Sequence, residues 1–137
     1  MTTGERVAVA ALSLVDTPFR LHGRDPATGL DCIGLAAVAM RRAGLGVWTP
    51  RGYGLRNNAI DSALACVDQC DLVPAAGALA PGDLVLVRPG PAQHHLLITA
   101  FGGWFAHAHA GLRRVVAMPG PPAWPIERCW RPQRKKD

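Results

Sequence analysis

The hydrophobic pattern of the chain changes period at about residue 83, and this change limits the folds that it can adopt. Before that point, apolar residues recur at helical spacing over residues 3–15, 32–44 and 59–70. After it, apolar and polar residues alternate in short runs separated by Gly and Pro, which is typical of four or five antiparallel strands. Helices followed by strands predict an α+β domain, with the helices packed on one side of an antiparallel sheet.

The length of 137 residues indicates one domain, spanning residues 1–137, with a core of ordinary size. No apolar run reaches the ~20 residues that cross a bilayer, and Glu5 precedes the apolar N-terminal stretch. We therefore expect synthesis in the cytoplasm without a signal peptide, and no membrane partner. We expect residues 72–83 to form a linker and the basic residues 132–137 to form a disordered tail. The net charge of +5 lacks the aromatic–basic interleaving of nucleic-acid modules, which argues against a nucleic-acid partner.

Asp31 and Cys32 mark the start of the middle helix. Asp31 is a good N-cap, because its carboxylate can accept the free amide protons of a new helical turn. Cys32 would then lie in the first turn, where the helix dipole and the unpaired amides favour a thiolate. Papain-like enzymes present their nucleophile in this way. An inert cysteine buried in the core gives the same local pattern, so both interpretations stay open on these residues alone.

Four of the five histidines fall in two adjacent predicted strands, as His94, His95, His107 and His109. A Cys-His enzyme needs an imidazole within reach of its thiol and a third polar group that orients the imidazole. If Gly102-Gly103 is a two-residue turn, His107 shares a face with His94, whereas a three-residue loop or a bulge places it with His95. His107 and His109, with His94 or His95, would also fit a zinc site.

The order of these motifs resembles that of the NlpC-type cell-wall peptidases, a papain-like family. The match runs over residues 17 to 130 and rests on Pro18-Phe19-Arg20, Asp31-Cys32-Ile33-Gly34-Leu35, Pro81-Gly82-Asp83, His95 with Ile98, and His107-Ala108. It looks closest to the short forms carried in phage-tail or gene-transfer-agent-like clusters. The resemblance implies a papain-like fold in which the nucleophile helix packs on the C-terminal antiparallel sheet.

The resemblance also implies roles for individual residues. Cys32 would be the nucleophile, His95 the base and His107 the group that orients it. The spacing therefore favours the three-residue loop or the bulge over the two-residue turn. The family hydrolyses the amide between D-glutamate and diaminopimelate in peptidoglycan stem peptides, through an acyl-enzyme. The same resemblance implies that the reaction needs no cofactor and no metal.

Three positions depart from the family pattern. Phe19 stands where many members have tyrosine, and Ile33 stands where serine is common. Leu97 stands two residues after His95, where a small residue is usual. Asp31, Phe19, Arg20 and His22 are expected to lie at the oxyanion site or along the cleft. The departures keep open a catalytically weak phage-tail-like assembly or cell-wall-binding module as a second interpretation. In either case we expect a peptidoglycan peptide and phage-tail-like proteins as partners, with action at the cell wall as part of a phage-like particle.

Overall fold

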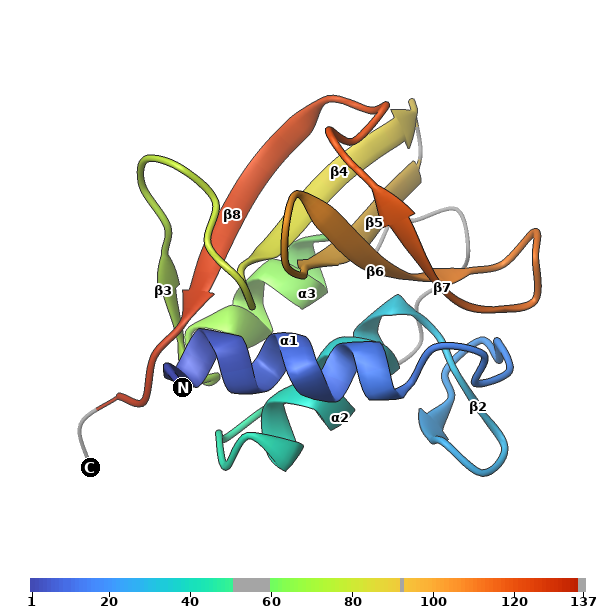
Figure 1. The fold of residues 1–137 in the computed structure, drawn as a ribbon, viewed down its shortest axis with the longest axis horizontal. Helices are drawn as coiled ribbons and strands as arrows, with labels where there is room; N and C mark the ends of the chain where they lie inside the picture. Colours follow the sequence, from blue (N-terminus) through green and yellow to red (C-terminus); the bar gives the residue numbers. More distant parts are fainter. Residues whose placement is uncertain (51–59, 92, 136–137) are drawn as a thin grey trace.

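The computed structural model describes residues 1–50, 60–91 and 93–135. Three helices and a six-stranded antiparallel sheet make up most of the fold, and a small two-stranded sheet precedes the second helix (Figure 1). The helices are α1 (Thr3–Ser13), α2 (Cys32–Arg42) and α3 (Ile60–Val67). The small sheet pairs β1 (Arg24–Asp25) with β2 (Gly29–Leu30). The strands of the large sheet are β3 (Leu72–Pro74), β4 (Leu84–Gly90), β5 (Gln93–Thr99), β6 (Trp104–His109), β7 (Arg114–Pro119) and β8 (Ile126–Pro132). The predicted α+β architecture is confirmed.

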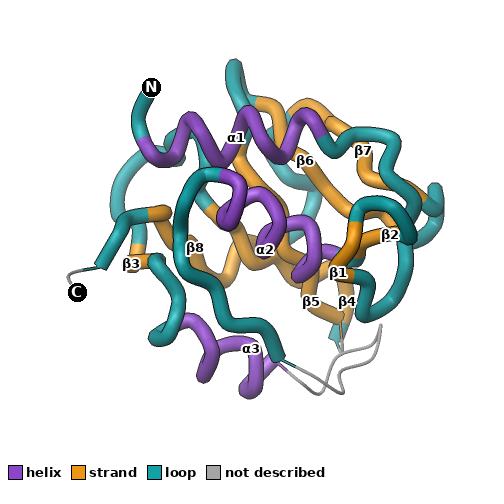
Figure 2. The backbone as a smooth tube through the Cα atoms, turned by 90° about the horizontal axis from the view of Figure 1, so that it is seen from below, coloured by secondary structure: helices purple, strands orange, loops and turns teal. Residues whose placement is uncertain are grey.

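Both faces of the large sheet are apolar. Successive side chains of a strand point to opposite faces, and consecutive apolar residues of β4 and β5 therefore supply both. Leu84, Leu86, Leu96 and Ile98 belong to the main core with α1 and α2, which cover that face (Figure 2). The opposite face carries a second, smaller cluster, made of Val85, Val87, Leu97 and Phe105 with Leu79, Met118, Trp124 and Cys129 packed against it. The strand order β3-β8-β4-β5-β6-β7 places β4 and β5 at the centre of the sheet.

Helix α1 begins at a capping box, in which Thr2 and Glu5 exchange side-chain to backbone hydrogen bonds. The helix ends at Ser13, slightly before the predicted residue 15. Its first turn lies against the turn that precedes β4, where a side chain on Gly82 would collide with the Gly4 backbone and one on Gly4 with the Pro81 carbonyl oxygen. This close approach explains why a glycine is needed in the Pro-Gly-Asp motif.

Three sequence predictions need correction or fall outside the structure. Within the expected linker, Leu72–Pro74 forms strand β3, which pairs with β8 at the sheet edge. The predicted tail is ordered up to Lys135, because Asp71 accepts hydrogen bonds from the backbone N–H groups of Gln133 and Lys135. Helix α3 is described over Ile60–Val67 and so ends before the predicted residue 70, while residue 59 and the expected asparagine cap lie outside the described residues. No helix in the described part of the chain is long and apolar enough to cross a membrane.

Asp83 joins the start of β4 to the neighbouring strand β8. Its carboxylate is fully buried, accepts the Ala80 N–H at 2.8 Å and binds the Arg131 guanidinium through both oxygens, at 3.0 and 2.8 Å. Arg131 is partly exposed, and the neighbouring carboxylate raises the pKa of its guanidinium. A buried acceptor that is fully paired in this way is costly to alter.

We expect the Asp83→Asn substitution to lower the free energy of unfolding by about 2 kcal/mol, measured by urea denaturation. The loss follows because an amide cannot accept from all three donors and leaves the guanidinium without its counter-charge. The matched change Asp16→Asn removes an exposed ion pair with Arg114 and should cost less than about 0.5 kcal/mol. Equal losses for the two variants would contradict the structural role of Asp83.

Candidate active site

The start of α2 is held by the carboxylate of Asp31, which is only 2% exposed. One oxygen accepts the Gly34 N–H at 2.8 Å, as the predicted N-cap requires, and also binds the Arg24 guanidinium at 3.0 Å. The other oxygen accepts the backbone N–H of His22 at 2.9 Å. Asp31 therefore joins the first turn of the helix, which begins with Cys32, to the loop that precedes it.

The glycine of the Asp-Cys-x-Gly motif has a steric explanation. A side chain on Gly34 would collide with the carbonyl oxygen of Gly23, in the loop that crosses the helix. A side chain on Gly23 would in turn collide with the backbone of Gly29. The loop can therefore lie directly on the first turn of α2 only because these positions lack a Cβ atom.

Strands β5 and β6 form a fork beside this helix end. They are paired only at Ile98↔Ala106 and Thr99↔Phe105, across a three-residue loop. Beyond these pairs β5 continues along β4 and β6 continues along β7, so the two strands diverge (Figure 1). The odd-length loop that the family spacing predicts is confirmed. We call the opening between the diverging strands the β5–β6 fork.

The backbone of Leu96 faces into the β5–β6 fork. Thr99 exchanges backbone hydrogen bonds with Asp83 and Gly82 on the β4 side, at 2.8 and 2.7 Å. Because backbone groups alternate sides along a strand, those of Leu96 face the β6 side, where the partner strand has moved away. The Leu96 N–H is directed at the Cys32 sulfur. The thiol therefore lies at the fork, next to the residue that follows His95 in β5.

Burial raises the pKa of the Cys32 thiol to about 11, and the adjacent negative charge of Asp31 acts in the same direction. The N–H groups of Leu96 and Ile33 and the positive charge of Arg24 lower this pKa, but their combined effect is smaller. The predicted thiolate is therefore wrong for the free protein, which holds a neutral thiol at neutral pH. Desolvation of the charged form outweighs the favourable amides of the helix start.

The rings of His95 and His107 lie together on the sheet face that carries the smaller core cluster. Their centroids are 5.3 Å apart in an edge-on arrangement, and Trp124 packs against both rings, at 6.1 and 5.8 Å. The ring of His109 lies 5.2 Å from that of His107. The three-residue loop thus groups the predicted base and the predicted orienting residue, whose catalytic roles stay predictions.

Burial keeps both of these imidazoles neutral. It lowers the pKa of His107 to about 3 and lowers that of His95, and neighbouring histidines add to both effects. His107 is 2% exposed, and neither of its ring nitrogens has a hydrogen-bond partner in the described part of the chain. Its contact with His95 is therefore one of packing, not of hydrogen bonding, in this structure.

His94 points to the other side of β5 and has a different environment. Its Nε2 lies 2.9 Å from a carboxylate oxygen of Glu127, which also forms an ion pair with Arg88 at 3.7 Å. His94 lines a cavity that also has Cys32 in its wall. Neither His94 nor His95 hydrogen-bonds the Cys32 sulfur among the residues described. Glu127 thus already holds His94, whereas the ring of His95 has no hydrogen-bond partner within those residues.

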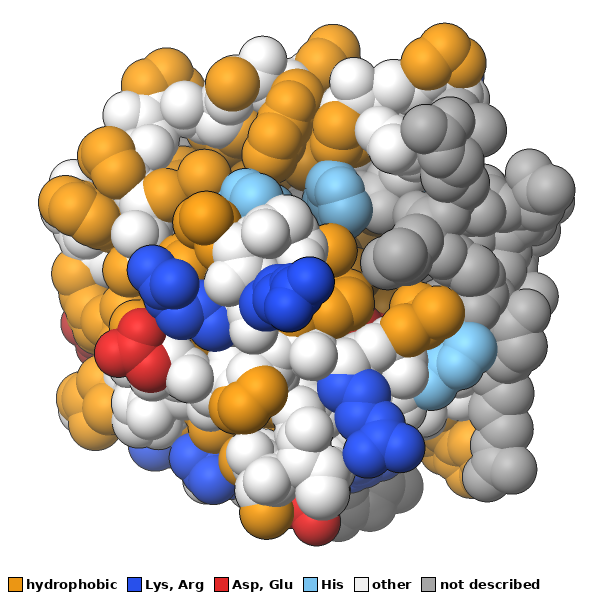
Figure 3. All heavy atoms as spheres, turned by 90° about the vertical axis from the view of Figure 1, so that its right-hand side faces the viewer, with side chains coloured by type: hydrophobic (Ala, Val, Ile, Leu, Met, Phe, Trp, Pro, Cys, Tyr) orange, Lys and Arg blue, Asp and Glu red, His pale blue; other side chains and the backbone are white. Residues whose placement is uncertain are grey.

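The remaining predicted site residues take different places. Phe19 packs against the main core and forms an isolated backbone bridge to Leu30, so its ring is a packing element. The side chains of Arg20 and His22 are exposed on the loop in front of α2. Figure 3 views this end of the molecule and shows histidine side chains at the surface among hydrophobic and basic ones. Arg24, the partner of Asp31, was missed because nothing in its local sequence distinguishes it from a turn residue.

The zinc interpretation finds no support in the geometry. In the described part of the chain, no group of three or more His, Cys, Asp or Glu side chains is arranged to hold a metal ion. The rings of His95, His107 and His109 follow one another by packing contacts rather than converging on a common point. The cluster is therefore better described as a group of imidazoles in edge-on and tilted packing contact.

Comparison with solved structures finds several with this fold. NlpC1 from Trichomonas vaginalis matches 96% of this chain and 43% of its own, with a TM-score of 0.70 and 20% sequence identity. An NlpC/P60 family protein from Bacillus cereus matches 94% and 40%, with a TM-score of 0.67 and 18% identity. The peptidoglycan hydrolase RipB from Mycobacterium tuberculosis matches 97% and 66%, with a TM-score of 0.61 and 23% identity.

These likenesses confirm the predicted NlpC-type, papain-like α+β fold. The chain spans about two fifths of the length of the first two proteins. No protein-family model matches the sequence, and no curated protein matches it either. The particular likeness to phage-tail forms stays a prediction.

Acid should destabilise the protein through His107. Its pKa is about 3 when folded and about 6.5 in an unfolded chain, so the unfolded state binds a proton first as the pH falls. Stability is then lost progressively from pH 6.5 towards pH 3, by about 1.4 kcal/mol per pH unit from this residue. Urea unfolding across this range should show a shallower pH slope for His107→Asn than for the wild type, and an equal slope for the two proteins would contradict the expectation.

The alkylation rate of Cys32 should report its raised pKa. We expect the rate with iodoacetamide to rise about tenfold per pH unit between pH 7 and 10, because only the thiolate reacts. Mass mapping of the Cys32 peptide gives the rate for this one residue. Asp31→Asn keeps a cap oxygen but removes the negative charge, and should therefore increase the rate at pH 8. An alkylation rate that no longer changes with pH above about pH 7 would show that the thiolate is already formed and would contradict the expectation.

Proposed function

We propose that this chain is a cysteine endopeptidase that hydrolyses amide bonds of peptidoglycan stem peptides, with the bond between D-glutamate and diaminopimelate as its target. The observation that carries the proposal is the placement of the Cys32 sulfur at the β5–β6 fork, beside the strand that bears His95. Supporting it is the fold, which resembles those of proteins described as peptidoglycan hydrolases. The substrate is the one that the motif resemblance implies.

In this proposal the reaction begins with a neutral Cys32 thiol and a neutral His95 imidazole. The raised pKa of Cys32 and the lowered pKa of His95 keep the proton on sulfur until a substrate carbonyl is in place. His95 then accepts this proton as the sulfur attacks, so that an acyl-enzyme forms through a tetrahedral intermediate. The resulting imidazolium protonates the leaving amine and is neutral again when it activates water for hydrolysis of the thioester.

Two further groups support these steps. The backbone N–H of Cys32, at the first position of α2, has no partner within the helix and is suited to stabilise the oxyanion. His107 and Trp124 pack on the ring of His95 and limit its rotation. His107 therefore positions the base by contact, while its own low pKa keeps it from competing for the proton.

A catalytically weak assembly or cell-wall-binding module is the second candidate. The observation that favours it is the high pKa of Cys32, which leaves little thiolate at neutral pH. In both cases the proposed partner is the peptidoglycan peptide. Association with phage-tail-like proteins, and delivery to the wall on a phage-like particle, are further parts of the proposal that rest on the motif resemblance alone.

Digestion of diaminopimelate-type sacculi, followed by mass identification of the released peptides, tests the proposal. The wild type should release fragments cut between D-glutamate and diaminopimelate, and Cys32→Ala should release none. His95→Ala should lower the rate by at least about a hundredfold, as expected for loss of a general base. The neighbour variant His94→Ala changes a residue on the other side of β5, in the cavity wall, and should lower the rate much less than His95→Ala does.

The outcomes separate the candidates clearly. If His94→Ala loses activity and His95→Ala keeps it, the general base is His94, on the other side of β5, and the proposed role of His95 is wrong. Release by neither wild type nor variant, together with binding of the protein to sacculi, would favour the wall-binding module. Equal release by wild type and Cys32→Ala would exclude Cys32 as the nucleophile.

A further inference from the structure

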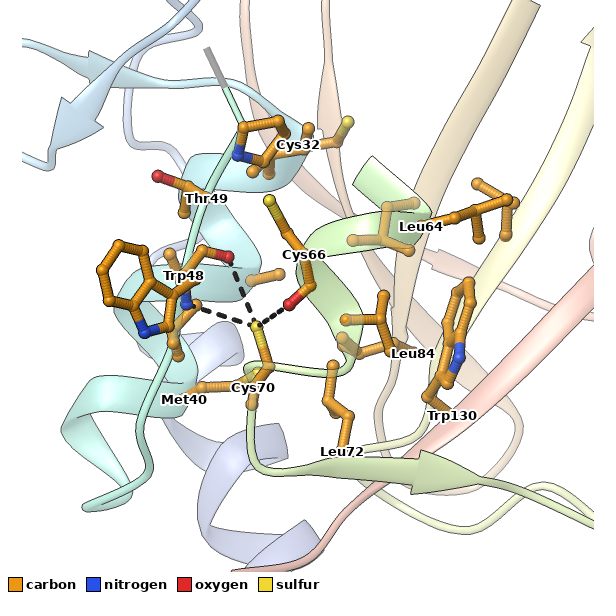
Figure 4. Close-up of a pocket in the computed structure, with 18 of the residues that line it drawn as sticks. Cys32, Met40, Trp48, Thr49, Leu64, Cys66, Cys70, Leu72, Leu84 and Trp130 are labelled. Atoms are coloured by element: carbon orange, nitrogen blue, oxygen red, sulfur yellow. Dashed lines mark hydrogen bonds between the residues drawn. The ribbon is translucent and has the colours of Figure 1, made fainter. Parts of the chain in front are cut away.

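A cavity of about 90 Å³ lies between α2, α3 and the sheet, with Cys32 at one end (Figure 4). Its wall is drawn from elements far apart in the sequence and is almost wholly apolar. Among the residues that line it are Met40, Leu64, Val67, Leu84, His94 and Trp130. No Asp, Glu, Lys or Arg is among the described lining residues.

One wall of the cavity is fixed by a cysteine rather than by apolar packing alone. The Cys70 sulfur accepts the Trp48 N–H at 3.2 Å and lies 3.3 Å from the carbonyl oxygens of Trp48 and Cys66. Figure 4 shows these contacts between the segment that carries Trp48 and the end of α3. They hold the segment against α3, so that the cavity has a definite wall on this side.

The size and chemistry of the cavity define what can occupy it. Protein cores leave few voids larger than a water molecule, and an apolar cavity of about 150 Å³ holds a benzene molecule. A cavity of about 90 Å³ is therefore suited to an aliphatic group of roughly four carbon atoms. A carboxylate or an ammonium group would lose its hydration there without gaining a counter-charge.

We propose that this cavity receives an aliphatic side chain of the substrate, of about leucine or methionine size, close to the carbonyl that Cys32 attacks. The inference rests on Cys32 being the nucleophile of the proposed function. It adds a requirement that D-glutamate and diaminopimelate do not meet with their own side chains, because these end in charged groups. The substrate must therefore carry a separate aliphatic group near the attacked carbonyl, while the charged groups of a stem peptide stay outside the cavity. Burial of that group favours chains of increasing length until the cavity is full.

A series of iodoacetamides with N-methyl, N-butyl and N-hexyl groups tests the cavity directly. Each reagent forms a sulfur–carbon bond at Cys32 as iodide leaves, and mass mapping gives the rate for this residue. We expect the rate to rise at least about tenfold from methyl to butyl, after division by the rates with N-acetylcysteine. The experiment uses the full chain at pH 9, where more of the thiol is ionised.

Matched variants show whether the dependence of the alkylation rate on chain length comes from the cavity. Val67→Phe, on the cavity wall, should fill the space and remove the dependence on chain length. Val9→Phe makes the same chemical change at a 44% exposed position of α1 and should leave the dependence unchanged. Leu64→Trp provides a second filled variant if Val67→Phe does not fold, as judged by thermal unfolding.

Rates that do not vary with chain length, or a Cys32 that none of the reagents modifies, would overturn the inference. So would a chain-length dependence that survives in both filled variants. The test does not depend on peptidoglycan. A clear dependence combined with no release from sacculi would support the cavity and reject the proposed substrate. Release from sacculi with a flat series would support the proposed function and reject the cavity as a substrate site.

Discussion

The buried carboxylate of Asp31 is the interaction on which the rest of the site depends. It caps α2 through the Gly34 N–H, and it also binds the Arg24 side chain and the His22 N–H of the preceding loop. The loop and the helix start are thereby fixed relative to each other. Since Cys32 is the next residue, this same carboxylate also fixes its place in the first turn of the helix.

The β5–β6 fork explains how a helix end and a sheet can share one site. Two strands that paired along their whole length would satisfy the Leu96 N–H within the sheet and leave no opening for Cys32. Because pairing stops after Ile98↔Ala106, that N–H needs another acceptor, and the Cys32 sulfur lies where one is required. The divergence of the strands therefore leaves an opening in the sheet and a backbone N–H that holds the Cys32 sulfur there.

The features that could be predicted from the sequence are those set by local chemistry or by strand parity. The role of Asp31 as a helix cap depends only on its neighbours in the chain. The spacing of twelve residues from His95 to His107 puts both side chains on one face of the sheet only if the loop between the strands has an odd number of residues. Strand β3 could not be predicted, because Leu72–Pro74 is too short to show a pattern and exists through its pairing with β8. The order of the tail depends on Asp71, which is more than sixty residues away from Lys135 in the chain.

The raised pKa of Cys32 could not be predicted for a deeper reason. Local sequence shows the amides at a helix start, which favour a thiolate, but not the strands that remove water from the sulfur. Asp31 adds to the effect, because the carboxylate that positions Cys32 also opposes its ionisation. Since oxidants attack thiolates, a neutral thiol is protected. The position of the Cys32 thiol and its protection therefore come from the same arrangement of Asp31 and the surrounding strands.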